Sequence, residues 1–263
     1  MMKQSEQSTK KHSSIDIHSE KSDRKGILGW GETLFRKFKT PFFLLLLLPI
    51  LFLYIFCMGV ALTPGMAFIS AVSSTSKSWP FILRNFSLGV SVATTYLMYG
   101  LTLIFIVPLV NKILPLKLRP LKSSWYSLEV IPWYYHNALT YLVRYTFLDF
   151  ITPTPLNKLF YQMMGMKIGK GSVINTSNIS DPCLIEIGDY VTVGGSASLV
   201  AHYGQKGILV IEKLIIKNKV TVGLKSSLFG GVIVEEGATI KPHEVILPKA
   251  IVPSIRKDKK EVA

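Results

Sequence analysis

The sequence predicts a membrane-anchored all-β protein, in which two membrane-spanning helices precede a solenoid of short, stacked parallel strands. Residues 42–62 and 86–110 contain no charged side chain, and each stretch is long enough to cross a bilayer. From Ile168 onwards, aliphatic residues return every six positions, a period that no helix has. The composition agrees, because a mean hydropathy of +0.36 with a net charge of +14 is typical of membrane proteins with basic flanks.

Several functional classes are excluded at this stage. The basic residues lie beside apolar stretches or in the tails, whereas a nucleic-acid binder would carry them on a folded module with interleaved aromatic residues. The two cysteines, Cys57 and Cys183, are too few for a disulfide framework. The sequence contains no phosphate-binding or dinucleotide-binding glycine motif, and no spacing of His, Cys or carboxylates indicates a metal site.

Residues 1–40 are expected to form a disordered basic tail that ends in a short amphipathic lead-in. Residues 1–25 lack an aliphatic pattern, so His12 and His18 are expected to have no role. The stretch "GILGWGETLFRKFK" that follows combines apolar and basic residues, as a helix at a membrane surface does.

Residues 41–122 are predicted to form a transmembrane hairpin, with spans at about 42–62 and 86–110. The first span starts too late and is too long for a cleaved signal peptide. Basic residues crowd the outer flanks of the hairpin, and only Lys77 and Arg84 lie between the spans. The flanking residues are Arg24, Lys25, Arg36, Lys37 and Lys39 before the first span, and Lys112, Lys117, Arg119 and Lys122 after the second. The positive-inside rule therefore predicts cytoplasmic termini, in a bacterial inner membrane.

Residues 123–163 are rich in Trp, Tyr and Phe but also carry Glu129, Arg144 and Asp149. This mixture favours helices that lie in the membrane interface over a third span. Prolines divide the stretch into segments.

Residues 164–252 carry the six-residue repeat, and a charged tail, 253–263, follows. The aliphatic positions are Ile168, Ile174, Ile187, Val193, Leu199, Ile216, Val222, Leu228, Val234, Ile240 and Ile246. Six residues fit one flat side and one corner of a triangular coil, with the aliphatic side chain pointing inward and glycine at tight turns. Three sides give a coil of about eighteen residues, so coils are expected to start at Ile168, Ile187, Ile216 and Val234.

Residues 154–246 resemble the hexapeptide-repeat acyltransferases, whose fold is a left-handed parallel β-helix. The lead-in "TPLNKLFYQMMGMKIGKGSVI" looks like that of the membrane-attached C-terminal regions of nonribosomal peptide synthetases, including poly-lysine synthetases. The resemblance implies a homotrimer with active sites between subunits. It also implies acyl-CoA or acetyl-CoA as donor or, for the synthetase branch, a carrier-protein thioester, with a carrier protein or adenylating enzyme as partner.

His202 is the candidate catalytic residue. The repeat fails after Leu199, where seventeen positions instead of six separate it from Ile216, and His202 stands at this break. Acyl transfer to an amine or hydroxyl needs a base that titrates near neutrality. The related acetyltransferases have their catalytic histidine at the corresponding place. Glu186, Asp189 and Glu212, or a backbone carbonyl, remain open as the group that orients the imidazole.

The donor is expected to bind in a groove along the solenoid, through exposed backbone amides and a cation for its phosphates. The candidate residues are Gly223, Ser226, Gly230, Gly231 and Lys249. Bulky neighbours such as Leu224 and Pro242 depart from the small residues that the family prefers beside the pantetheine arm.

The sequence thus predicts a membrane-associated acyltransferase that moves an acetyl, acyl or aminoacyl group from a thioester to an amine or hydroxyl. The alternative is a non-catalytic membrane scaffold that uses the solenoid as an interaction surface. The number of coils and the bulky groove residues favour this alternative.

Overall fold

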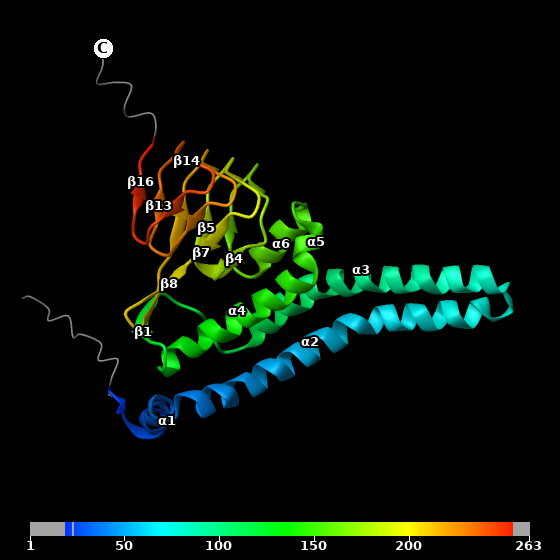
Figure 1. Cartoon of the computed structure of the whole chain (residues 1–263), viewed down its shortest axis with the longest axis horizontal. Coiled ribbons are helices and arrows are strands. Elements are labelled where there is room, and N and C mark those ends of the chain that lie inside the picture. Colours follow the sequence, from blue (N-terminus) through cyan, green and yellow to red (C-terminus); the bar gives the residue numbers. More distant parts are fainter. Residues whose placement is uncertain (1–18, 23, 255–263) are drawn as a thin grey trace, which may run out of the picture.

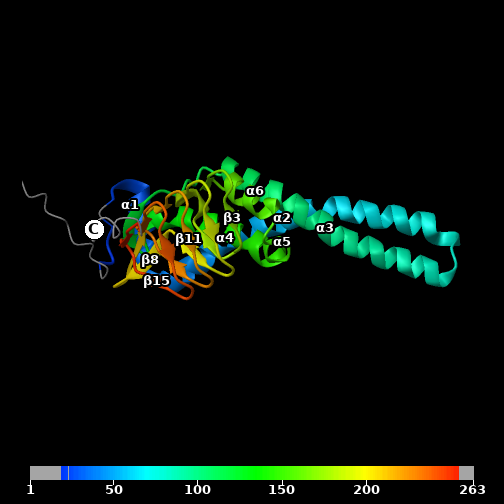
Figure 2. The same ribbon diagram turned by 90° about the horizontal axis from the view of Figure 1, so that it is seen from above.

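The computed structural model describes residues 19–22 and 24–254, so the expectations for His12, His18 and most of both tails lie outside the described residues. A long helical hairpin extends from a body in which further helices pack against a stack of β-coils (Figure 1). The tip of the hairpin and the first helix, α1 (Gly26–Lys37), lie at opposite ends of the molecule (Figures 1 and 2).

The hairpin consists of α2 (Lys39–Thr75) and α3 (Phe81–Ile113), both long and apolar enough to span a membrane. Each helix runs beyond its predicted span, and α2 continues through Pro64 and Gly65, which lie just after the first span. The two helices approach closely at Gly65, where the hydroxyl of Thr95 donates a hydrogen bond of 3.1 Å to the Gly65 carbonyl. Small residues at such crossings allow apolar helices to pack without a hydrophobic driving force.

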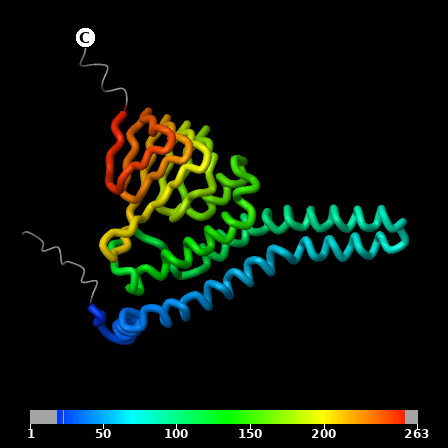
Figure 3. The backbone as a smooth tube through the Cα atoms, viewed as in Figure 1, coloured from blue at the N-terminus to red at the C-terminus, as the bar shows by residue number. Residues whose placement is uncertain are grey.

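The six-residue repeat folds as a three-sided solenoid of parallel sheets, as predicted. Each side of the triangle is one sheet, and successive coils stack along it (Figure 3). The first sheet contains β2 (Lys167–Ile168), β5 (Ile185–Ile187), β10 (Leu214–Ile216), β13 (Ile233–Val234) and β16 (Ile251–Val252). The second contains β3 (Val173–Ile174), β6 (Thr192–Val193), β11 (Thr221–Val222) and β14 (Thr239–Ile240). The third contains β4 (Ile179–Ser180), β7 (Ser198–Val200), β12 (Ser227–Leu228) and β15 (Val245–Ile246).

The predicted coil starts fall in register on one sheet. Ile187 pairs with Ile168 on one side and with Ile216 on the other, and Ile216 pairs with Val234. Val234 in turn pairs with Val252, which begins a further side. The inward aliphatic side chains are almost all buried, so each coil covers the apolar face of the next.

The break in the repeat is a β-hairpin that leaves the solenoid. It consists of β8 (His202–Gln205) and β9 (Ile208–Ile211), joined by a tight turn in which Lys206 and Gly207 both have positive φ. Strand β1 (Leu121–Ser124), which follows α3, pairs antiparallel with β9. The extra residues therefore connect the solenoid to the chain that emerges from the helical hairpin.

Helix α4 (Ile131–Val143) lies between the helical hairpin and the solenoid (Figure 1). After α4 the chain continues through a π-helical turn (Arg144–Leu148), α5 (Asp149–Ile151) and α6 (Pro155–Met163). Buried residues cover much of α4, among them His136, Asn137 and Leu139. The helix thus contacts protein on both of its sides.

Helix α6 covers the first coil of the solenoid. Its Asn157 side chain donates a 3.0 Å hydrogen bond to the Ile174 carbonyl, and the hydroxyl of Tyr161 donates one of 2.8 Å to the Ser177 carbonyl. A stack of coils has an unpaired end that must be covered for solubility. The buried contacts of α6 provide that cover.

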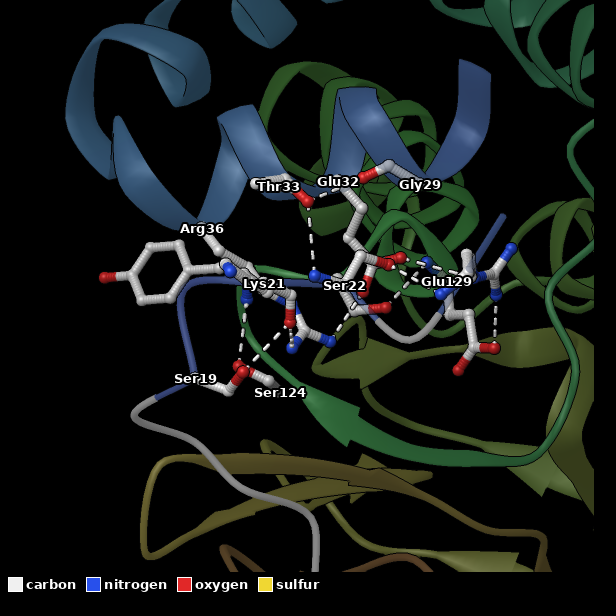
Figure 4. Close-up of polar contacts among 12 residues, drawn as sticks. Ser19, Lys21, Ser22, Gly29, Glu32, Thr33, Arg36, Ser124 and Glu129 are labelled. Carbon is white, nitrogen blue, oxygen red and sulfur yellow. Dashed lines mark hydrogen bonds and ion pairs between the residues drawn. The ribbon is translucent and has the colours of Figure 1, made fainter. Parts of the chain in front are cut away.

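An ion-pair cluster ties α1 to the body (Figure 4). Glu32 is only 2% exposed and contacts Arg36 at 2.6 Å and Arg24 at 3.2 Å. Arg24 also pairs with Glu129, just before α4. A buried carboxylate needs such partners, so this cluster holds α1 close to the segment that precedes α4.

The packing of α3 predicts a sharp contrast between two of its glycines. A Cβ atom at Gly100 would collide with the ring of Phe147, whereas one at Gly89 would meet no atom within 4 Å. Gly100→Ala is therefore expected to cost about 1–3 kcal/mol and to lower the melting temperature by several degrees. Gly89→Ala, the matched control, should leave it unchanged or raise it. Thermal unfolding in detergent measures both, and equal melting temperatures would contradict the packing.

Burial of His136 predicts a loss of stability at acid pH. The side chain is 3% exposed, its Nδ1 lies 3.1 Å from Asn111 Oδ1, and burial lowers its pKa from 6.5 to about 4, against the opposing charge of Asp181. The His136 side chain therefore binds a proton more readily in the unfolded chain than in the folded protein. The folded protein keeps its full stability above pH 6.5 and loses this contribution as pH falls to 4. The loss is on the order of 3 kcal/mol.

His136→Gln should flatten the pH dependence of the melting temperature between pH 6.5 and 4. If the melting temperature falls equally with pH in this variant and in the unaltered protein, His136 does not cause the loss of stability at acid pH.

Candidate active site

The candidate histidine stands where the solenoid chain turns into the hairpin. His202 is the first residue of β8, and its Nδ1 lies 2.5 Å from Oδ2 of Asp181. The imidazole keeps 18% of its surface exposed, whereas the carboxylate has none. A carboxylate beside Nδ1 accepts a hydrogen bond from the Nδ1–H group and so fixes the tautomer of the imidazole. The lone pair of Nε2, on the opposite edge of the ring, is then available as a base.

Asp181 is itself held by a helix outside the solenoid. The side-chain amide of Asn137 on α4 donates a 2.6 Å hydrogen bond to Asp181 Oδ1, and the Asp181 backbone N–H donates one of 3.1 Å to Asn137 Oδ1. This paired contact accompanies a left-handed backbone at Asp181, with φ of 58°. Both carboxylate oxygens therefore have a partner, as a fully buried carboxylate requires.

The three carboxylates considered from the sequence as partners of His202 are engaged elsewhere. Glu186 contacts Lys213 at 2.8 Å and Lys167 at 3.2 Å, and the hydrogen bond from Lys213 is the largest cause that lowers its pKa. Asp189 accepts a 2.6 Å hydrogen bond from the Lys170 backbone, and Glu212 pairs with Lys249 at 3.0 Å.

The six-residue period does not predict that Asp181 lies beside His202. An eighteen-residue coil would place residue 184 beside His202, but on this side Ile179 pairs with Leu199, which is a shift of twenty residues. The extra residues form the 3₁₀ turn Pro182–Leu184 directly after Asp181. The sequence signal that could have revealed the site is the Asp-Pro pair, which favours a turn at a solenoid corner.

Two tryptophans form a wall beside the histidine. The ring of Trp133 on α4 meets the His202 imidazole edge-on, with 4.9 Å between ring centroids, and Trp125 meets Trp133 in the same manner at 5.6 Å. Aromatic edges of this kind fix ring orientation. The imidazole is thus held by a carboxylate at one nitrogen and by an indole against its ring.

His202 opens on a pocket of about 970 Å³ between the β8–β9 hairpin and the last coils. Trp125, Phe229 and Leu247 contribute apolar surface, and two lysines, Lys122 and Lys249, also line it. The contact with Glu212 raises the pKa of Lys249, so this cation stays charged at neutral pH. The pocket combines a base, cations and apolar walls in one place.

The residues proposed to bind the donor occupy two different corners of the solenoid. Gly230 and Gly231 lie beside Lys249, whose backbone N–H donates a 3.3 Å hydrogen bond to the Gly230 carbonyl. Gly231 has φ of 81°, which favours glycine. Gly223 and Ser226 lie at the preceding corner, where the buried Ser226 hydroxyl donates a 2.8 Å hydrogen bond to the Gly223 carbonyl. Only the first group adjoins the His202 pocket.

No family model matches this chain. In sequence it is similar to a delta-poly-L-ornithine synthetase of Acinetobacter baumannii, with 22% identity over 180 residues. The match covers 66% of this chain but only 13% of the synthetase, so the chain corresponds to a small part of that protein.

Among solved structures, the chain is similar to a hexapeptide-repeat-containing acetyltransferase and to serine acetyltransferases. A Vibrio cholerae enzyme of this class is 18% identical and covers 31% of this chain and 57% of its own, with a TM-score of 0.20. For Entamoeba histolytica serine acetyltransferase isoform 3 the identity is 13%, the coverages are 72% and 69%, and the TM-score is 0.25. Soybean serine acetyltransferase is 16% identical, the match covers 64% of this chain and 71% of the soybean chain, and the TM-score is 0.26.

The resemblance indicated by the sequence had two parts, a hexapeptide-repeat solenoid and a relationship to synthetases of amino-acid polymers. The three-sided stack of parallel sheets agrees with the first part. The match to the ornithine-polymer synthetase agrees with the second. The chain therefore resembles the hexapeptide-repeat acyltransferases in fold, and part of a polymer synthetase in sequence.

Proposed function

We propose that this protein is a membrane-anchored acyltransferase, which transfers an acyl or aminoacyl group from a thioester to an amine or hydroxyl with His202 as general base. The observation that supports this most strongly is the contact between His202 and the buried Asp181 at the mouth of the large pocket. An imidazole oriented by a carboxylate is the arrangement that proton abstraction from a weak nucleophile requires.

In this mechanism the acceptor attacks the thioester carbonyl directly. Nε2 of His202 takes the proton from the attacking amine or hydroxyl, while Asp181 stabilises the imidazolium through Nδ1. As the tetrahedral intermediate collapses, the carbon–sulfur bond breaks and the thiolate takes the proton from His202. An amide or ester and a free thiol are formed, so protons and electrons balance.

We assign the donor's phosphates to the Lys249 side of the pocket. Lys249, Gly230 and Gly231 are adjacent there, and Lys122 adds a second cation to the same pocket. This end suits acyl-CoA and equally the phosphopantetheine arm of a carrier protein, because both carry a phosphate before the thioester. Gly223 and Ser226 are left with a structural role at their own corner.

The buried carboxylate also argues against a purely structural scaffold. A surface that only binds a partner does not require a fully buried carboxylate in contact with a partly exposed imidazole. Desolvation of a carboxylate costs several kcal/mol, which is about as much free energy as the attraction to its partners supplies. A cost of this size is commonly associated with sites that need the charge.

We further propose that α2 and α3 cross the bilayer, with the solenoid and both ends of the chain on the cytoplasmic face of a bacterial inner membrane. Large apolar side chains cover the outer face of α2, including Leu44, Leu48, Phe52 and Ile55. Lysines and arginines gather on the body side of the hairpin. A homotrimer, as the resemblance implies, and a carrier protein as donor complete the proposal.

Replacement of His202 tests the catalytic role. His202→Asn should lower thioester-dependent acyl transfer by about 10²–10⁴-fold. Transfer by the detergent-purified protein is measured as thiol release that depends on an added amine. The matched control is His243→Asn, since His243 is an exposed histidine on the last coils with φ of 61°, a conformation that asparagine tolerates. Full activity in His202→Asn would exclude the base assigned here.

Cysteine labelling tests the membrane orientation. In a Cys183→Ser background, Ser78→Cys at the exposed hairpin tip should react with an impermeant maleimide from outside the cell. Lys241→Cys on the solenoid should react only after the membrane is opened. Labelling of both positions from the same side would contradict the hairpin topology.

A further inference from the structure

A narrow apolar groove runs between the first membrane helix and α4. It has a volume of about 340 Å³, and Leu47, Ile50 and Leu51 of α2 face Trp133 and Ala138 of α4 across it. Leu51 is 53% exposed, so the groove continues into the apolar outer face of α2. The groove is therefore open to the surface that would contact hydrocarbon.

Three polar side chains of this groove already have hydrogen-bond partners within the protein. The Tyr54 hydroxyl donates a 2.9 Å hydrogen bond to the Ala138 carbonyl, and the Tyr141 hydroxyl lies 2.7 Å from Ser180 Oγ. Asn137 is paired with Asp181. The indole N–H of Trp133 is buried without a hydrogen-bond partner. A polar ligand would find few groups to bind, whereas an alkyl chain with one carbonyl fits the lining.

A second depression, of about 310 Å³, continues this groove towards the site. It shares Tyr134 with the groove and Trp125 with the His202 pocket. Lys39 and Thr40, at the start of α2, line it, and the Lys39 ammonium lies 5.1 Å from the centroid of the Tyr126 ring. A cation, a hydroxyl and aromatic rings at the end of a membrane helix are typical contacts of lipid phosphate groups.

The three cavities follow one another in a fixed chemical order. The apolar groove adjoins the cationic depression at Tyr134, and this depression adjoins the His202 pocket at Trp125. An amphiphile has the same order of parts, namely hydrocarbon tail, phosphate and terminal head group. A soluble acceptor would enter the open pocket from solvent and would have no use for the first two cavities.

We propose that the acyl acceptor is a membrane phospholipid whose head group ends in a primary amine or a hydroxyl. One alkyl chain lies between α2 and α4, the phosphate meets Lys39, and the head group reaches His202 past Trp125. The head-group proton passes to His202, the acyl group becomes an amide or ester of the lipid, and the donor thiol is released. This inference rests on the proposed function and names its acceptor.

Lipid binding can be measured independently of catalysis. Trp30 and Trp79 are replaced by Phe in the full-length protein, so that Trp125 and Trp133 remain as the fluorescent reporters. Phosphatidylethanolamine with dibrominated chains is then titrated into the protein in detergent micelles. We expect saturable quenching, and Ala138→Phe, which fills the groove, should raise the half-saturating lipid fraction about tenfold. Leu48→Phe adds the same bulk on the open face of α2, 60% exposed, and should change nothing.

Transfer assays compare lipid and soluble acceptors. Phosphatidylethanolamine and phosphatidylglycerol are set against O-phosphoethanolamine and glycerol phosphate, which carry the same head groups without tails. Ala138→Phe should raise the KM for the lipids about tenfold and leave transfer to the soluble compounds unchanged. Lys39→Gln should raise the lipid KM several-fold, whereas Lys37→Gln, at an exposed lysine outside the depression, should not.

The outcomes separate this inference from the proposed function. If His202-dependent transfer occurs but soluble head groups are acylated as well as lipids, and groove variants behave like their controls, the lipid acceptor is wrong and the acyltransferase stands. If lipid binds in the groove and no thioester donor is consumed, acyl transfer to lipid is overturned. Should Ala138→Phe fail to fold, Ala138→Leu fills less of the groove and must shift lipid binding in the same direction.

Discussion

The contact between Asn137 and Asp181 is the interaction on which the rest of the site depends. It joins a helix packed on the helical hairpin to a corner of the solenoid, through one hydrogen bond between side chains and one from the Asp181 backbone. Without it, a carboxylate that has no solvent contact would lose a partner, at a cost of about 1–3 kcal/mol or more for a charged group. The orientation of His202 therefore depends on the position of α4 as much as on the solenoid.

The solenoid and the β8–β9 hairpin contribute in different ways to the position of His202. A coil stack is stabilised by many equivalent contacts between neighbours, so its corners are rigid positions for side chains. The β8–β9 hairpin leaves one of these corners and pairs with β1, the next strand after α3. Because His202 is the residue at which the chain leaves the solenoid, this imidazole lies at the junction between the repeat and the rest of the chain.

The degree to which the sequence predicts this structure follows from the range of the interactions involved. The solenoid sides and the apolar spans are local patterns, so Ile187, Ile216 and Val234 could be aligned without coordinates. His202 could be singled out because it interrupts such a pattern. Asp181 could not, since an irregular turn shifts the pairing on its side of the first coil. Asn137 could not either, because nothing in the local sequence of α4 indicates that this helix faces the solenoid.

Helix α4 also connects the candidate site to the long apolar helix α2. Its Trp133 contacts His202 and also lines the apolar groove against α2, while the neighbouring Asn137 holds Asp181. A single helix thus carries a wall of the groove and a support of the base. Tyr54 of α2 donates a hydrogen bond to the α4 backbone as well. The contacts of α4 therefore connect the long apolar helix α2 to the residues that surround His202.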